Sequence, residues 1–85
     1  MDRDAAHGRI YWRSRRGLLE LELLLIPFVR DRFDGLPENE QDDYIRLLEH
    51  DDLDMYDWIQ GRSEPEDQSL RAIVSRIREH NSSGG

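Results

Sequence analysis

The longest apolar run of this chain, residues 18–29 (LLELELLLIPFV), limits what the chain can fold into. The run has 12 residues and includes two glutamates and a proline, whereas about 20 consecutive apolar residues are needed to cross a bilayer. It is therefore expected to lie in a protein core, with no membrane insertion. Its first residues alternate between apolar and polar, but leucine and glutamate favour helices, so we expect a helix over residues 18–33, with a kink at Pro27.

The rest of the pattern also predicts helices, and the chain is assigned to the all-α class as a small compact bundle of about five short helices. The clearest amphipathic spacing, i, i+3, i+4 and i+7, belongs to Leu70, Ile73, Val74 and Ile77. The expected helices cover residues 4–15, 18–33, 37–50, 52–60 and 66–80. With 85 residues in total, residues 1–80 are expected to form a single helical domain and residues 81–85 a flexible tail.

Turn residues are placed between these expected helices. Gly17 and Gly61 are each expected to end a helix, because glycine adopts the left-handed conformation at little steric cost. Pro37 suits a first helical turn. Asp51 or Asp52 is expected to cap the helix that follows, since a carboxylate can accept hydrogen bonds from free backbone amides.

The distribution of charge restricts the partners of the chain. The formal net charge is −7 and all 12 basic residues are arginines. Residues 1–33 carry seven arginines against five acids, and residues 34–85 carry five arginines against fourteen acids. An acidic chain is repelled by phosphate backbones, so no nucleic-acid partner is expected. The start of the chain lacks the pattern of a targeting signal, so we expect a cytoplasmic bacterial protein, monomeric when free.

The sequence contains no pattern typical of an enzyme or a metal site. Cysteine is absent, and the three histidines, His7, His50 and His80, have no metal-ligand spacing. The acidic stretch EHDDLDMYD does not follow the ligand positions of a calcium-binding EF-hand loop. Glycine-rich phosphate loops and nucleophile elbows are also missing. The chain is therefore not expected to be an enzyme, nor to hold a metal.

The segment RRGLLE contains the candidate binding residues, which are Arg15, Arg16, Gly17 and Glu20. In one interpretation Arg13, Arg15 and Arg16 occupy the last turn of the first helix, where cations are favoured by the helix dipole. In the other, Gly17 lets a partner's backbone or a flat cofactor approach closely, between the opposite charges of Arg16 and Glu20. This basic corner would then dock against an anionic surface.

The same segment resembles the R-G-x-x-E signature of the succinate dehydrogenase flavinylation factors, and the resemblance covers nearly the whole chain. It includes the aromatic pair in IYW, the LIPF step and the block LLEHDDLDMYDW. Three positions depart from the family pattern: Glu22 stands where aspartate is frequent, Pro37 where a serine or threonine cap is frequent, and Leu53 where proline is frequent. None of these departures alters the signature.

The resemblance implies a five-helix fold and a chaperone-like role. Such a factor binds the flavoprotein subunit of succinate dehydrogenase and promotes covalent attachment of FAD, which the partner holds, so the factor itself binds no cofactor stably. Whether fumarate reductase is a second client stays open. The resemblance places the signature residues, with Arg15 supporting them, nearest the partner's flavin site. The second block would border that face or hold it in place through Glu49, Asp51, Asp52 and Trp58, although Trp58 is more typical of a core residue. The alternative function is a small regulatory binding module such as an antitoxin, a label that members of this family have also carried.

Overall fold

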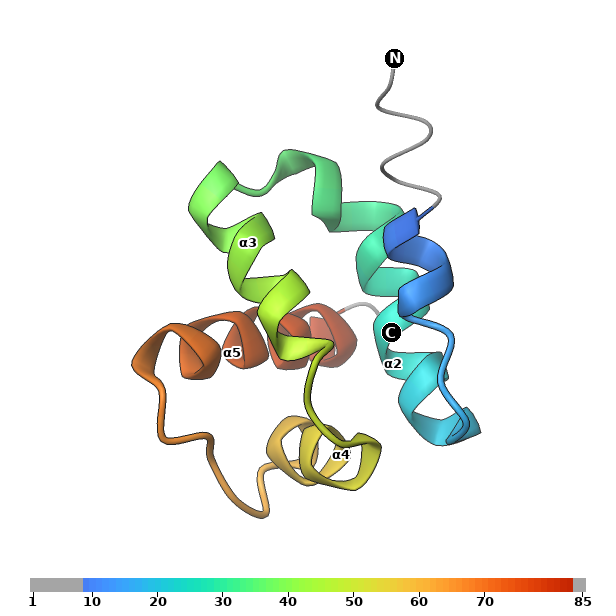
Figure 1. Cartoon of the computed structure of the whole chain (residues 1–85), viewed down its shortest axis with the longest axis vertical. Helices are drawn as coiled ribbons and strands as arrows, with labels where there is room; N and C mark the ends of the chain where they lie inside the picture. The colour runs from blue at the N-terminus through green and yellow to red at the C-terminus, as the bar shows by residue number, and fades with distance from the viewer. Residues whose placement is uncertain (1–8, 84–85) are drawn as a thin grey trace.

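The computed structural model describes residues 9–83, and only helices, turns and loops occur there (Figure 1). The predicted all-α class is confirmed for this part of the chain. Residues 9–13 are helical. They are followed by α2 (Leu19–Arg32), the 3-10 turn η1 (Phe33–Gly35), α3 (Glu38–Leu47), α4 (Asp52–Gln60) and α5 (Gln68–Ser83). None of the helices described is long and apolar enough to cross a membrane.

The helix α5 lies at the centre of the bundle and packs against α2, α3 and α4. In Figure 1 it runs across the molecule with α3 on one side and α4 on the other, and α2 stands at one end. Its buried face carries the residues with the predicted i, i+3, i+4, i+7 spacing, which are Leu70, Ile73, Val74 and Ile77. They pack with apolar side chains of the other helices, including Leu21, Leu25, Phe28, Leu47, Met55 and Ile59.

A buried polar contact joins the first helix to this core. The Ser14 hydroxyl donates to the Ile10 carbonyl at 2.8 Å, and its oxygen lies 2.7 Å from the Tyr44 hydroxyl. Because the single hydroxyl hydrogen of Ser14 is used on the carbonyl, the Tyr44 hydroxyl is the donor of the second bond. Burial raises the pKa of Tyr44, and the bond to Ser14 opposes that shift in part. The contact fixes the first helix against α3.

The helix ends follow the predictions in part. α2 continues through Pro27, and Phe33, the last residue of the predicted range, begins η1. Gly61 ends α4 with φ of 83°, as predicted. The same prediction for Gly17 is wrong, since Gly61 has the one positive φ among the glycines of residues 9–83. The first helix stops at residue 13, two residues earlier than expected, and the part of that prediction before residue 9 lies outside the described residues.

The last helix begins and ends later than predicted. The Asp67 carboxylate accepts a hydrogen bond from the Ser69 amide at 2.8 Å, and this bond is the main cause that lowers the pKa of Asp67. α5 then extends through Ser83, so the predicted tail of residues 81–85 begins inside a helix. The Asn81 amide donates to the Leu24 carbonyl of α2 at 3.2 Å and to the Ile77 carbonyl at 2.8 Å. Residues 84–85 lie outside the described part.

Candidate functional site

The side chain of Arg16 connects the loop before α2 to the junction between α3 and α4. Its Nε donates to Asp52 Oδ1 at 2.7 Å. Its Nη1 donates to the Leu48 carbonyl at 3.0 Å, and its Nη2 donates to the His50 carbonyl at 3.0 Å. A further bond from Nη1 reaches the Arg13 carbonyl at 3.1 Å. Arg16 therefore makes four hydrogen bonds within the chain.

These bonds give Arg16 a structural role. The last carbonyls of a helix have no partner inside it, and Arg16 binds the carbonyl of Leu48, the cap residue of α3, and that of His50 in the turn that follows. The Arg16 side chain is only 18% exposed. The interpretation that Arg16 neutralises the end of the first helix describes its bond to Arg13, but the other three bonds go to a different part of the chain.

Gly17 leaves a bare stretch of backbone at the surface. A Cβ added there would meet Asp52 Oδ2 at 4.0 Å, an ordinary van der Waals contact. Since its φ is not positive, the backbone does not require glycine either. Nothing in residues 9–83 therefore demands a glycine at this position, which favours the interpretation that another molecule approaches there.

Glu20 and Arg15 lie on either side of this loop. Glu20 is exposed in the first turn of α2 and has no hydrogen bond or ion pair with another residue that the structure describes. Arg15 Nε donates to Glu22 Oε1 at 3.1 Å, and the Arg15 guanidinium stands over the Trp12 ring, 5.8 Å from its centroid. Both signature-region arginines thus pair with acids of the chain itself.

These pairings bear on the expected basic docking corner, whose arginines also include the exposed Arg13. The charge of Arg15 is balanced by Glu22 and that of Arg16 by Asp52. The carboxylates that remain exposed near the loop include Glu20 on α2 and two residues of the second block, Glu49 and Asp51. Around Gly17, exposed carboxylates therefore lie beside the exposed side chains of Arg13 and Arg15.

The second block meets Arg16 of the signature at a shallow depression. The depression is lined by Arg16, Glu49, His50, Asp51, Asp52 and Leu53. Asp51 occupies the cap position of α4, but its side chain makes no capping hydrogen bond, and Asp52 binds Arg16 instead. The carboxylates of this block thus do not cap the helix.

Trp58 lies behind the depression. It is half-buried and packs against the core, and its ring contacts the His50 ring edge-on at 5.2 Å between centroids. The sequence did not identify His50 or the Leu48 carbonyl as part of this site. No residue type could have indicated the carbonyls, because every residue carries one.

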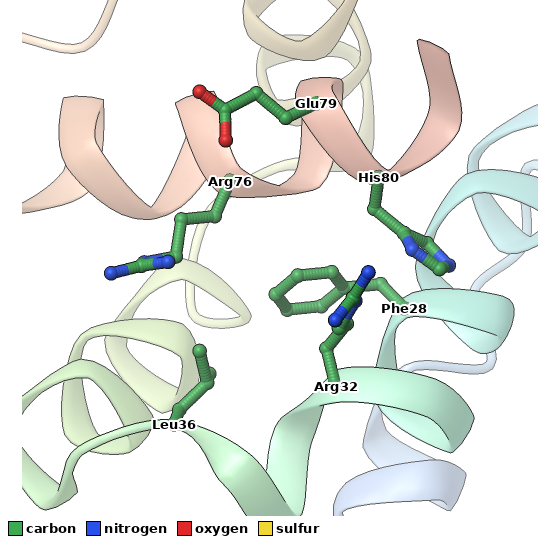
Figure 2. Close-up of a pocket in the computed structure, with 6 residues that line it drawn as sticks. All are labelled: Phe28, Arg32, Leu36, Arg76, Glu79 and His80. Carbon is green, nitrogen blue, oxygen red and sulfur yellow. The ribbon is translucent and has the colours of Figure 1, made fainter. Parts of the chain in front are cut away.

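A second hollow, of about 260 Å³, lies between α2, α5 and the segment after η1 and contains none of the predicted residues (Figure 2). Its lining residues are Phe28, Arg32, Leu36, Arg76, Glu79 and His80. Arg76 Nη2 donates to Glu40 Oε2 at 3.1 Å, and His80 Nε2 lies 3.3 Å from Asp31 Oδ2. Arg76 and His80 thus each join α5 to another helix.

The part of the chain that the structure describes holds no group of three or more histidines and carboxylates placed to bind a metal ion. The depression beside Gly17 is lined by carboxylates, by Arg16 and His50, and by the apolar Leu53. Such an arrangement can recognise another surface.

Comparison with known proteins gives concordant matches. The sequence model of a family described as "Flavinator of succinate dehydrogenase" matches residues 8–81. The chain is 47% identical over 74 residues to "FAD assembly factor SdhE" of Vibrio cholerae, covering 87% of this chain and 86% of that protein. It is 49% identical over 69 residues to the protein of the same name from Pseudomonas aeruginosa, covering 81% and 82% of the two chains.

A solved structure agrees with these matches. The solution structure of a UPF0350 protein superposes with a TM-score of 0.79 at 43% identity, covering 99% of this chain and 89% of the other. The fold, the position of the R-G-x-x-E signature and the extent of the family match therefore lead to one assignment. This chain belongs to the family of flavinators of succinate dehydrogenase.

Proposed function

We propose that this chain is an assembly factor that binds the flavoprotein subunit of succinate dehydrogenase and promotes covalent attachment of FAD to that subunit. Family membership supports the proposal, since relatives 47% and 49% identical are named FAD assembly factors. One structural observation supports the position of the site: Gly17 is exposed, and neither its φ nor the space around it requires a glycine.

The chain acts in this proposal by holding the partner in a productive conformation, without catalysis of its own. The FAD stays with the flavoprotein, and the chemistry of the covalent step belongs to that subunit. Arg16 fixes the loop to α3 and α4, so the Gly17 backbone is presented in one arrangement. A preformed surface loses little entropy on binding, which leaves more binding energy to order the partner.

Individual residues receive distinct roles. Gly17 and Glu20 contact the partner near its flavin site, and Arg15 supports them. Arg16 and Asp52 hold the loop. Glu49 and Asp51 border the contact surface, and Trp58 supports it from the core side.

The test is in-gel flavin fluorescence of denatured extract from cells that lack the gene, with variants of the chain restored. Only covalently bound FAD survives denaturation. Gly17→Arg is expected to abolish the fluorescent band at the size of the flavoprotein subunit, because a long side chain fills the approach. Gly35→Arg is the matched control, since Gly35 is exposed and has open space around its Cα.

Glu20→Ala and Glu38→Ala form a second matched pair, because both glutamates lie in the first turn of a helix and are exposed. Only Glu20→Ala is expected to dim the band. Circular dichroism must show that all four variants are folded. A band of normal intensity with folded Gly17→Arg would refute the assignment of the site to Gly17. An unchanged band in cells without the gene would favour the alternative function, a regulatory binding module. The same gel, read at the size of the fumarate reductase subunit, decides whether that enzyme is a second client.

A further inference from the structure

The large apolar side chains that remain exposed are confined to one region of the molecule. Among the residues that the structure describes they are Trp12 at 67% and Leu19, Leu23 and Leu53 at 64% each. They belong to the first helix, the first two turns of α2 and the first turn of α4. These three elements meet at the loop that contains Gly17, where Arg16 binds Asp52. Apolar side chains gathered in one region mark an interaction surface.

The side chains on α2 lie next to one another. Leu19 and Leu23 are four residues apart, and Leu19 and Glu22 are three apart, so all three are neighbours on the helix surface. Glu22 is bound by Arg15, whose guanidinium stands over the Trp12 ring. Trp12, Leu19 and Leu23 are thus connected through this ion pair, and we refer to these three residues as the apolar patch.

Trp12 is held in place although it is exposed. The Arg15 guanidinium lies 5.8 Å from the centroid of its ring, and the Tyr11 ring contacts it edge-on at 5.7 Å between centroids. Arg15 is in turn fixed by Glu22 at 3.1 Å. A tryptophan held before binding loses little side-chain entropy when a partner covers it, and tryptophan is enriched among the residues that dominate binding energy.

We propose that the apolar patch, with Leu53, is the main docking surface for the flavoprotein subunit and that Trp12 is its aromatic anchor, an inference that rests on the proposed function. The matching surface of the partner is apolar with charged residues of both signs at its edge, because the carboxylates of Glu20, Glu49 and Asp51 and the guanidinium groups of Arg13 and Arg15 are exposed around it. A second copy of this chain is a poor occupant, since each copy carries a net charge of −7. Arg15 is a positioning residue in this arrangement.

Binding is measured by calorimetry between the purified full chain and the purified flavoprotein subunit. Leu23→Glu on α2 is compared with Ala72→Glu on α5, because both positions are exposed and both variants add one negative charge. Leu23→Glu is expected to weaken binding about tenfold or more, and Ala72→Glu to change it by less than about twofold. Trp12→Ser is expected to weaken binding at least as much as Leu23→Glu.

A second measurement follows the Trp12 ring directly, by its fluorine NMR signal. The chain has two tryptophans, so incorporation of 5-fluorotryptophan gives two fluorine signals, and Trp58→Phe assigns them. On addition of unlabelled flavoprotein subunit, the Trp12 signal is expected to shift and broaden. Arg15→Gln and Glu22→Gln are each expected to weaken binding modestly, and the double variant is expected to bind no worse than either single variant, because all three lose the same ion pair.

The outcomes separate this inference from the proposed function. If the wild-type chain binds and supports flavinylation, but Leu23→Glu and Trp12→Ser bind as tightly as Ala72→Glu, the docking surface is overturned and the function stands. If the wild-type chain does not bind the flavoprotein subunit at all, both the docking surface and the proposed function are overturned. Sedimentation showing a dimer of the free chain that Trp12→Ser dissociates would assign the patch to a second copy and would also overturn the inference.

Discussion

Arg16 shows how a residue of a recognition signature can act inside the fold. Its four hydrogen bonds join the loop before α2 to the end of α3 and the start of α4. Loss of flavinylation in an Arg16 variant therefore does not by itself demonstrate contact with a partner. Gly17 and Glu20 are cleaner probes of contact, because neither supports the fold in a comparable way.

We expect Arg16→Ala to lower the free energy of unfolding by about 2–4 kcal/mol, because it leaves the carbonyls of Leu48 and His50 and the Asp52 carboxylate without their donor. Urea unfolding measures the change. Arg30→Ala is the control, since Arg30 is exposed and its one ion pair within residues 9–83 is with its neighbour Asp31, and a loss within about 0.5 kcal/mol is expected there. Equal losses in the two variants would contradict the structural role of Arg16.

Tyr44 provides a prediction of how the stability of the fold changes at alkaline pH. Tyr44→Phe removes the buried bond to Ser14 and is expected to cost about 0.5–1.5 kcal/mol at neutral pH. Burial raises the pKa of Tyr44 in the folded chain above its ordinary value of 10.0. Its contribution is therefore complete below pH 10 and decreases as the pH rises from there toward the folded-state pKa.

The measurement is urea unfolding of wild type and Tyr44→Phe at pH 8 and pH 11. The wild-type chain is expected to lose more stability between these two values than the variant. The sequence has no lysine, so no lysine titration overlaps this range. A variant that loses as much stability as the wild type would show that Tyr44 does not titrate differently in the two states.

Two of the helices show that local sequence patterns can be sufficient to predict the position of a helix. The predicted helix over 18–33 corresponds to α2 (Leu19–Arg32), and the one over 52–60 to α4 (Asp52–Gln60). These predictions depended on local spacing and on a glycine stop, which are properties of neighbouring residues. The end of the first helix was predicted two residues too late. The contact of Ser14 with Tyr44, 30 residues away, and the pairing of Arg16 with Asp52, at a separation of 36 residues, were not predicted, because local spacing carries no signal of either.

The glycine that ends α4 gives a prediction at the scale of a single helix. Gly61→Ala is expected to destabilise the fold by about 1–2 kcal/mol, because an alanine must adopt the positive φ of 83°. Its Cβ would also lie 3.0 Å from Arg78 Nη2, at the end of a flexible side chain. Gly35→Ala is the control, since Gly35 lacks a positive φ and has nothing within 4 Å of an added Cβ. Thermal unfolding should show a lower midpoint for the Gly61 variant alone.

At the scale of the whole molecule, a hydrogen bond joins the end of α5 to α2. The Asn81 amide binds the Leu24 carbonyl across 57 residues of sequence. Asn81→Ala is expected to lower the free energy of unfolding by about 1 kcal/mol relative to Ser82→Ala, measured by urea unfolding. Ser82 is exposed on the same turn, so the pair corrects for the higher helix propensity of alanine. Equal stability of the two variants would show that this contact contributes nothing.

The sum of the charges in a segment of sequence does not show how those charges pair in the folded molecule. Residues 1–33 are net positive in sequence, but Arg15 and Arg16 are paired in the fold. A count of charges along the chain cannot show which of them neutralise each other across elements. The apolar side chains were likewise missed as a surface, because Leu19 and Leu23 belong to the same run as the buried Leu21 and Leu25.

The bond between Arg16 and Asp52 has a consequence for synthesis of the protein. A ribosome that has released only the first 50 residues has not yet supplied the carboxylate that fixes the Gly17 loop. In the proposed function, the surface around Gly17 is therefore completed only when α4 has formed and docked. We expect a nascent or truncated chain to lack this surface, so that the flavoprotein subunit meets a competent factor only after the factor has folded.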